Sequence, residues 1–249
     1  MSEPMREVLV TGGGRGVGRA IALRFAEEGA RVFVNFFVNR EAAEKTARDI
    51  ELRGGRAHVV QADLKDPAEI GRLFAEVARV AGRLDVLVSN AASGVLKSAL
   101  DLSAKHWDWV LATNTRALLL CAQEAAKLMG VGGRIVALSS LGSVRTVPGY
   151  VAVGVSKAAL EALVRYLAVE LAPRGITVNA VSAGAVETDV WRVIPDGEAL
   201  LAAARARTPG GCLVSAEELA EVVHFLASPA AQAIQGQVVV VDKGYSILA

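Results

Sequence analysis

The sequence has few cysteines, few aromatic residues and no cluster of basic residues. These absences argue against a cysteine metal site, an aromatic core and a nucleic-acid-binding surface. Its two cysteines, Cys121 and Cys212, lack the spacing of metal ligands, so we expect no metal site and a core position for Cys121. Only 5% of the 249 residues are aromatic whereas 53% are hydrophobic, which predicts an aliphatic core. The formal net charge is +1, and no run of Lys or Arg offers the basic patch that nucleic-acid binding requires.

Long apolar runs are missing as well. Residues 1–10 enter a strand pattern almost at once and contain no signal-peptide core. The longest apolar runs, such as residues 117–122, are far too short to span a bilayer. We therefore expect a soluble, cytoplasmic protein with no membrane partner.

Short Val-rich runs alternate with longer amphipathic runs along the whole chain. The short runs show little polar alternation, which is typical of strands buried on both faces of a sheet. The strands are predicted at residues 7–11, 31–37, 57–61, 85–89, 134–138, 176–181 and 237–241. The helices between them are predicted at residues 16–28, 41–53, 67–80, 106–128, 155–171 and 216–226.

Repeated β-α units of this kind predict an α/β fold. We expect one Rossmann-type domain over residues 1–249, with a doubly wound parallel sheet of about seven strands and helices on both faces. Residues 188–211 depart from the β-α alternation, because prolines and glycines flank a short helical stretch at 198–207. This segment follows a strand end, where ligands bind in open α/β sheets, so we interpret it as a substrate lid; a plain surface excursion is the alternative.

A glycine-rich segment joins the first strand to the first helix. Glycines there permit a tight turn and let the backbone approach a pyrophosphate, while the helix N-terminus offers free N–H groups. An ordinary structural turn is the alternative, but the position at the start of a repeating β-α chain favours dinucleotide binding. The residues predicted to bind the cofactor here are Gly12, Arg15, Gly16, Val17 and Gly18.

The end of the second strand indicates which dinucleotide binds. An NAD site usually places an acidic residue there for the adenosine ribose, and residues 35–40 contain none. Arg15 and Arg40 are suited to a 2′-phosphate, although either can be a solvated charge at a helix end. We therefore predict NADPH as the cofactor.

Two further strand ends offer contacts to the cofactor. Asp63 and Leu64 follow the third strand, where Asp63 is placed to accept a hydrogen bond from the adenine amino group or, alternatively, to cap the next helix. Asn90 follows the fourth strand and begins a turn of small residues against the predicted cofactor cleft.

An ordered set of motifs resembles the short-chain dehydrogenase/reductase family over essentially the whole chain. The matching residues are Thr11-Gly-x-x-x-Gly-x-Gly18, Asn90-Ala-Ala, Asn114, Ser139-Ser140 and Lys157. The resemblance implies a seven-stranded Rossmann-type sheet, a nicotinamide cofactor and commonly a homotetramer. We expect such a homotetramer to pack through the long helices that begin near His106 and Tyr150. Apolar side chains lie on more than one face of these helices, including Leu118, Leu119, Leu120, Leu160, Leu163 and Leu167.

The sequence departs from the Tyr-x-x-x-Lys signature of that family. Val153 stands four residues before Lys157, and the nearest tyrosine, Tyr150, stands seven before it. Tyr-x6-Lys spacing resembles the enoyl-thioester reductases, and several stretches resemble the enoyl-[acyl-carrier-protein] reductase III branch. These stretches begin at Asn90, His106, Cys121, Ser139 and Val153.

The resemblance implies NADPH-dependent reduction of a 2-enoyl thioester. Tyr150 is the expected proton donor to the developing enolate oxygen, because Tyr166 is expected to pack within its helix and Tyr245 lies near the C-terminus. Lys157 is expected to bind the nicotinamide ribose, with Asn114 supporting it, and Ser140 to position the thioester carbonyl. Thr188 is expected to bind the nicotinamide carboxamide. The lid residues expected to line an acyl slot are Val190, Trp191, Val193 and Ile194.

Two other functions stay open. One is a carbonyl reductase of similar build, acting on 3-oxoacyl thioesters or polyketide intermediates. The other is a cofactor-binding regulator without turnover, if Val153 abolishes catalysis, although Lys157, Ser140 and Asn114 argue against it. Neither the acyl chain nor its carrier, acyl-carrier protein or coenzyme A, follows from the sequence.

Overall fold

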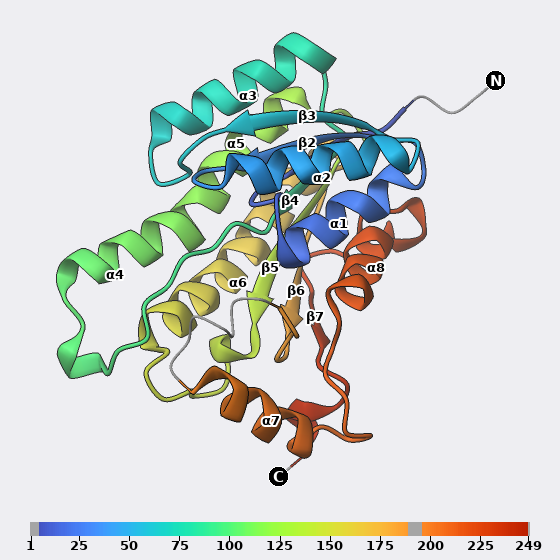
Figure 1. Cartoon of the computed structure of the whole chain (residues 1–249). Helices are drawn as coiled ribbons and strands as arrows, with labels where there is room; N and C mark the ends of the chain where they lie inside the picture. The colour runs from blue at the N-terminus through green and yellow to red at the C-terminus, as the bar shows by residue number, and fades with distance from the viewer. Residues whose placement is uncertain (1–4, 189–195, 249) are drawn as a thin grey trace.

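The computed structural model describes residues 5–188 and 196–248, and its strands form one parallel sheet (Figure 1). Seven strands lie in the order β3-β2-β1-β4-β5-β6-β7. Their bounds are β1 Glu7–Val10, β2 Arg31–Phe36, β3 Arg56–Gln61, β4 Val86–Ser89, β5 Arg134–Ser140, β6 Thr177–Ala183 and β7 Val238–Val241. The predicted Rossmann-type α/β fold is confirmed, and each predicted strand lies within two residues of an observed one.

Helices cover both faces of the sheet. One apolar core includes α1, α2 and α8, and the other includes α3, α5 and α6. The bounds are α1 Gly16–Ala26, α2 Arg40–Leu52, α3 Pro67–Ala81, α4 Ala104–Leu111, α5 Ala117–Leu128, α6 Val151–Leu171, α7 Gly197–Arg207 and α8 Ala216–Leu226. Because strands such as β1 and β4 are covered on both sides, every residue in them is buried.

The predicted helix at 106–128 is not continuous. It begins at Ala104, and a π-helical turn, η2 (Ala112–Arg116), separates α4 from α5. Such turns insert one residue into a helix and are frequent at functional sites. Here the turn contains Asn114, which is buried.

The sixth helix begins earlier than the sequence pattern suggested. α6 starts at Val151 rather than at residue 155, and Tyr150 is its N-cap residue. The Tyr150 carbonyl accepts a hydrogen bond from the Gly154 N–H at 2.8 Å, which closes the first helical turn. Tyr150 is therefore held at the start of a helix rather than in a free loop.

Cys121 is buried in the core as predicted, and burial raises the pKa of its thiol to about 12. None of the helices within residues 5–188 and 196–248 is long and apolar enough to cross a membrane. Over the same residues, no three His, Cys, Asp or Glu side chains gather as metal ligands would.

Candidate cofactor cleft and active site

The turn between β1 and α1 can be built only with glycine at several positions. Gly12 and Gly16 have φ angles of +62° and +52°, the left-handed region that favours glycine. A Cβ atom on Gly18 would lie 2.3 Å from the Gly12 carbonyl oxygen, so no larger residue fits. Arg15, the N-cap residue of α1, makes no side-chain hydrogen bond to the helix end. This cradle therefore fits a dinucleotide pyrophosphate at the α1 N-terminus.

A cavity of about 680 Å³ adjoins this turn. Its walls come from the glycine-rich turn, from α2 and from the segment around α7, and they include Arg15, Lys45, Thr188, Glu198 and Arg205. Val17 lies in the first turn of α1, but its side chain packs against the core. Only the backbone of Val17 is therefore placed to meet a cofactor.

The two arginines predicted to bind a 2′-phosphate have different surroundings. Arg15 is exposed at the cavity, whereas the Arg40 guanidinium stacks 5.2 Å from the centre of the Phe36 ring. Arg40 also donates to Gln61 Oε1 at 3.2 Å and pairs with Glu44 at 3.6 Å. Arg40 is absent from the cavity wall, and Lys45, which sequence reasoning missed, is present there. The basic side chains at the cavity are thus Arg15 and Lys45, together with Arg19, which is paired with Asp49, and Arg205, which is paired with Glu187.

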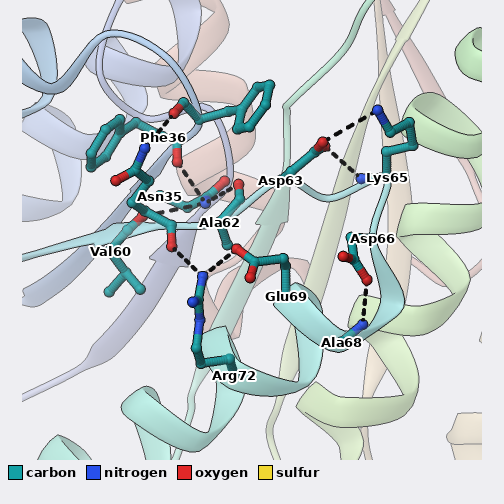
Figure 2. A network of polar contacts seen from close by, with 12 residues as sticks. Asn35, Phe36, Val60, Ala62, Asp63, Lys65, Asp66, Ala68, Glu69 and Arg72 are labelled. Carbon is teal, nitrogen blue, oxygen red and sulfur yellow. Dashed lines mark hydrogen bonds and ion pairs between the residues drawn. The ribbon is translucent and has the colours of Figure 1, made fainter.

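Figure 2 shows the polar network at the end of β3. Asp63 accepts a hydrogen bond from the Lys65 N–H at 2.9 Å and pairs with the Lys65 ammonium at 3.4 Å. The helix-cap alternative for Asp63 is wrong, because Asp66 caps α3 by accepting from the Ala68 N–H at 2.8 Å. Leu64 is buried in the core, so only its backbone can meet an adenine.

Asn90 supports the glycine-rich turn from the end of β4. Its amide group donates to the Thr11 carbonyl at 2.9 Å and to the Gly12 carbonyl at 3.3 Å. Its backbone N–H donates to Thr11 Oγ1 at 2.9 Å. The Asn90 side chain is thus used to hold the turn, and any contact it makes with a cofactor is secondary to that.

Tyr150 and Ser140 lie together above the end of β5. The Tyr150 ring packs over Gly142, where an added Cβ would lie 2.6 Å from Tyr150 Cε1. Burial raises the pKa of the Tyr150 phenol, and a hydrogen bond with the Ser140 side chain lowers it in part. The phenol therefore stays protonated at neutral pH and is available as a donor.

Lys157 is buried two helical turns beyond Tyr150. Its ammonium donates to the Leu138 carbonyl at 2.6 Å. Burial lowers the pKa of Lys157 to about 8, and the nearby charge of Glu161 acts in the opposite direction. Seven residues are close to two helical turns, so ideal helix geometry would place Tyr150, the N-cap residue of α6, on about the same face as Lys157.

Asn114 does not support Lys157 by a direct hydrogen bond. Its side-chain oxygen accepts from the Ser93 N–H at 2.8 Å, and its amide group donates to the Ser93 carbonyl and to Ser156 Oγ, each at 2.9 Å. Ser156 precedes Lys157 in α6, so the connection runs through the helix. Asn114 therefore fastens the segment after β4 to α6.

The segment predicted as a lid adjoins the cavity, and the two remaining tyrosines lie at the surface or near the C-terminus. Thr188 lies at the cavity beside Gly16, and α7 covers the same cavity within the predicted lid. The proposed acyl-slot residues Val190, Trp191, Val193 and Ile194 lie outside the described residues. Tyr166 is 72% exposed, so the expectation that it packs within its helix is wrong. Tyr245 stacks under the Arg207 guanidinium near the C-terminus.

Comparison with known proteins identifies similar chains along nearly the full length. Residues 12–246 match a family model described as enoyl-(acyl carrier protein) reductase. A 1-cyclohexenylcarbonyl-CoA reductase from Streptomyces collinus is 45% identical, over 97% of this chain and 87% of its own. Versicolorin reductase 1 from Aspergillus parasiticus is 38% identical, over 95% of this chain and 94% of its own.

Solved structures show the same architecture. A short chain dehydrogenase from Burkholderia cenocepacia, in complex with NADP, has a TM-score of 0.91 and 37% identity, over 97% of this chain and 98% of its own. An angucycline C-6 ketoreductase with bound NADP has a TM-score of 0.91 and 32% identity, over 98% of this chain and 96% of its own.

Proposed function

The chain belongs to the short-chain dehydrogenase/reductase family, and we propose that within it the protein reduces the C=C bond of a 2-enoyl thioester with NADPH. The observation that carries this proposal is the position of Tyr150, seven residues before Lys157 and beside Ser140, with the apolar Val153 four residues before the lysine. The phenol of Tyr150 therefore occupies a different position from the phenol of a tyrosine at residue 153, where the usual Tyr-x-x-x-Lys spacing would place it.

This displacement suits a conjugated substrate. Three residues along a helix shift a side chain by about 4.5 Å along the axis and by about 60° around it. In an enoyl thioester the oxygen that gains charge lies two bonds beyond the carbon that receives hydride. In a ketone the oxygen is attached to that carbon, so a ketone requires a closer donor. The Tyr150 position therefore favours the enoyl substrate.

The cofactor assignment combines the cradle with the relatives. Gly12, Gly16 and Gly18 form the pyrophosphate cradle, and Arg15 with Lys45 supplies cations at the adjoining cavity. Two similar structures were solved with NADP, which supports NADPH here. When bound, the nicotinamide supplies the hydride for the substrate Cβ.

Tyr150, Ser140 and Lys157 would stabilise the negative charge that develops on the thioester oxygen. Tyr150 donates its phenolic proton to the enolate oxygen, and Ser140 lies beside the phenol, where it would position the thioester carbonyl. The Lys157 ammonium lowers the free-energy cost of negative charge at Tyr150. The enol then takes up one proton from solvent at Cα and returns its O–H proton to Tyr150, so the thioester carbonyl is restored and one hydride and one proton are added in total.

A ketoreductase acting on polyketide-type or 3-oxoacyl substrates is the second candidate. It is favoured by the names of two relatives, a versicolorin reductase and an angucycline ketoreductase. The enoyl substrate is preferred because the 45% identical relative is named for reduction of a cyclohexenylcarbonyl-CoA, a conjugated enoyl thioester. A role in fatty-acid or polyketide metabolism in the cytoplasm follows from this proposal.

Oxidation of NADPH by the purified protein tests it. Crotonyl-CoA and acetoacetyl-CoA share the same four-carbon chain and carrier, so a faster reaction with crotonyl-CoA isolates the preference for C=C over C=O. Repeating the assay with crotonyl-acyl-carrier protein compares the carriers. Reduction of acetoacetyl-CoA with no reaction on either crotonyl thioester would establish the ketoreductase instead.

A further inference from the structure

Three consecutive residues at the end of β5 each lie against a different residue of α6 or its N-cap. The Leu138 carbonyl accepts from the Lys157 ammonium at 2.6 Å, and the Ser139 hydroxyl donates to Glu161 Oε1 at 2.5 Å. The Ser140 side chain lies close enough to the Tyr150 phenol to lower its pKa. Spacings of seven and four residues place Tyr150, Lys157 and Glu161 along one face of the helix. Glu161 thus continues the row that contains the reactive groups.

Glu161 is buried, with only 7% of its surface exposed. A buried carboxylate is costly unless hydrogen bonds and an opposite charge compensate it. Ser139 supplies the hydrogen bond, and Lys157, one turn earlier on the same face, supplies the charge. The proposed mechanism assigns no role to Glu161, although its burial beside Lys157 has an energetic cost.

We propose that Glu161 is a positioning residue for Lys157: its buried carboxylate, fixed by Ser139, keeps the Lys157 ammonium charged and held at the Leu138 carbonyl of β5. The inference about charge holds for the free protein, and its catalytic consequence rests on the proposed function. No bond is made or broken at Glu161, which acts through its electric field on the lysine.

The electrostatics agree with this geometry. Burial lowers the pKa of Lys157, and the field of Glu161 raises it. Elements packed against α6 carry other titratable groups, but Glu161 is the charged group that acts on the pKa of Lys157 within the described residues. Those other groups are Lys105, His106 and Asp108 on α4, Arg116 on η2, Cys121, Glu124 and Lys127 on α5, Arg134 at the far end of β5, and Arg174 on the short helix at Ala172–Arg174. Glu161→Gln removes the negative charge and nearly preserves the shape.

Titration of Lys157 in the cofactor-free protein tests the inference without any substrate. The protein has seven lysines, so lysine Cε labelling with ¹³C gives few NMR signals, and the signal absent from Lys157→Arg identifies Lys157. We expect the titration midpoint of Lys157 to fall by about one pH unit or more in Glu161→Gln, the usual effect of losing a close opposite charge. Glu170→Gln, at an exposed position of the same helix, is the matched control and leaves the midpoint unchanged.

Two further variants keep the result interpretable. Ser139→Ala retains the Glu161 carboxylate but removes the hydrogen bond that fixes it. The titration midpoint of Lys157 should therefore also fall, by less than in Glu161→Gln. This variant carries the test if Glu161→Gln fails to fold. Glu161→Asp retains the charge and restores the midpoint toward the wild-type value. An unchanged Lys157 midpoint in a folded Glu161→Gln or Ser139→Ala protein would overturn the inference.

Kinetics then separate this inference from the proposed substrate. With a substrate that turns over, the basic limb of the kcat/KM profile moves to lower pH in Glu161→Gln, while the NADPH dissociation constant at pH 6 stays the same. An equal loss of kcat/KM at every pH would show a merely structural role. If no enoyl thioester reacts, the proposed function fails and the NMR titration still decides the role of Glu161.

Discussion

Gly94 and Val153 interlock so closely that a Cβ atom on Gly94 would lie 2.5 Å from Val153 Cγ2. Val153 is 6% exposed and packs with Val110 and Ala152 in a small apolar cluster between α4 and α6. The position of the usual catalytic tyrosine is therefore part of the packing here. Because residue 94 is glycine, the chain after β4 can lie directly against Val153.

Gly94→Ala should destabilise the protein because the new methyl group overlaps with Val153. We expect a loss of about 1–3 kcal/mol in the free energy of unfolding, the usual cost of overpacking. Val153→Ala removes the offending methyl groups, so the double variant should lose less than the sum of the two single variants. Urea unfolding of the four proteins measures this coupling. Additive losses would show that residues 94 and 153 do not interlock.

Tyr150→Phe should lower kcat on the preferred thioester by about 10²-fold or more, as loss of an oxyanion donor does. NADPH affinity should be unchanged, because the phenol is placed toward the substrate. Steady-state kinetics and fluorescence titration of NADPH measure the two effects. Tyr166→Phe is the control, since Tyr166 is exposed on the same helix. Full activity in Tyr150→Phe would exclude this tyrosine as the donor.

Arg15→Ala and Lys45→Ala should each weaken NADPH binding by about 1–2 kcal/mol and leave NADH binding nearly unchanged, because both cations line the cavity. Arg40→Ala should have a smaller effect, since Arg40 is already engaged with Phe36, Gln61 and Glu44. Titration with both nucleotides measures the difference. A larger loss of NADPH affinity in Arg40→Ala than in Arg15→Ala would assign the 2′-phosphate contact to Arg40 instead.

The catalytic efficiency should fall as pH rises through about 8. Lys157 acts as a cation, and its pKa is lowered to about 8, so the charged fraction decreases above that pH. The pKa of Tyr150 is raised, so the phenol stays protonated through the same interval. A kcat/KM profile from pH 6 to 10 reports these groups in the free enzyme. A kcat/KM that stays constant as pH rises through 8 would exclude Lys157 as the titrating group.

We expect a homotetramer in which α5 and α6 pack against their copies. Leu118, Leu160 and Leu167 are buried within the protomer, but Tyr166 and Val169 leave an apolar surface on α6. Light scattering at micromolar concentration should give four times the 26.0 kDa chain mass. Tyr166→Glu with Val169→Glu should reduce that mass, and Leu52→Glu on α2 should not. A wild-type monomer would exclude the tetramer.

The strands and the glycine cradle could be predicted from local pattern, because buried parallel strands and tight glycine turns have strong signatures. The π-helical turn at Asn114 could not, since one inserted residue hardly alters apolar periodicity. Lys45 was missed because its direction depends on long-range packing. An added Cβ on Gly14 would lie 3.2 Å from Ala43, so α2 rests directly on the glycine-rich turn and presents Lys45 to the cavity.

The segment of residues 90–98 connects the two halves of the site. Asn90 is hydrogen-bonded to Thr11 in the cofactor cradle, Ser93 to Asn114, and the Lys97 N–H to the carbonyl of Gly149, which precedes Tyr150. A nucleotide that rigidifies the glycine-rich turn also reduces the conformational freedom of the protein near the Tyr150 phenol. Binding of the thioester then costs less conformational entropy. We therefore expect positive cooperativity between the two ligands, with nucleotide binding first and no change of backbone shape needed.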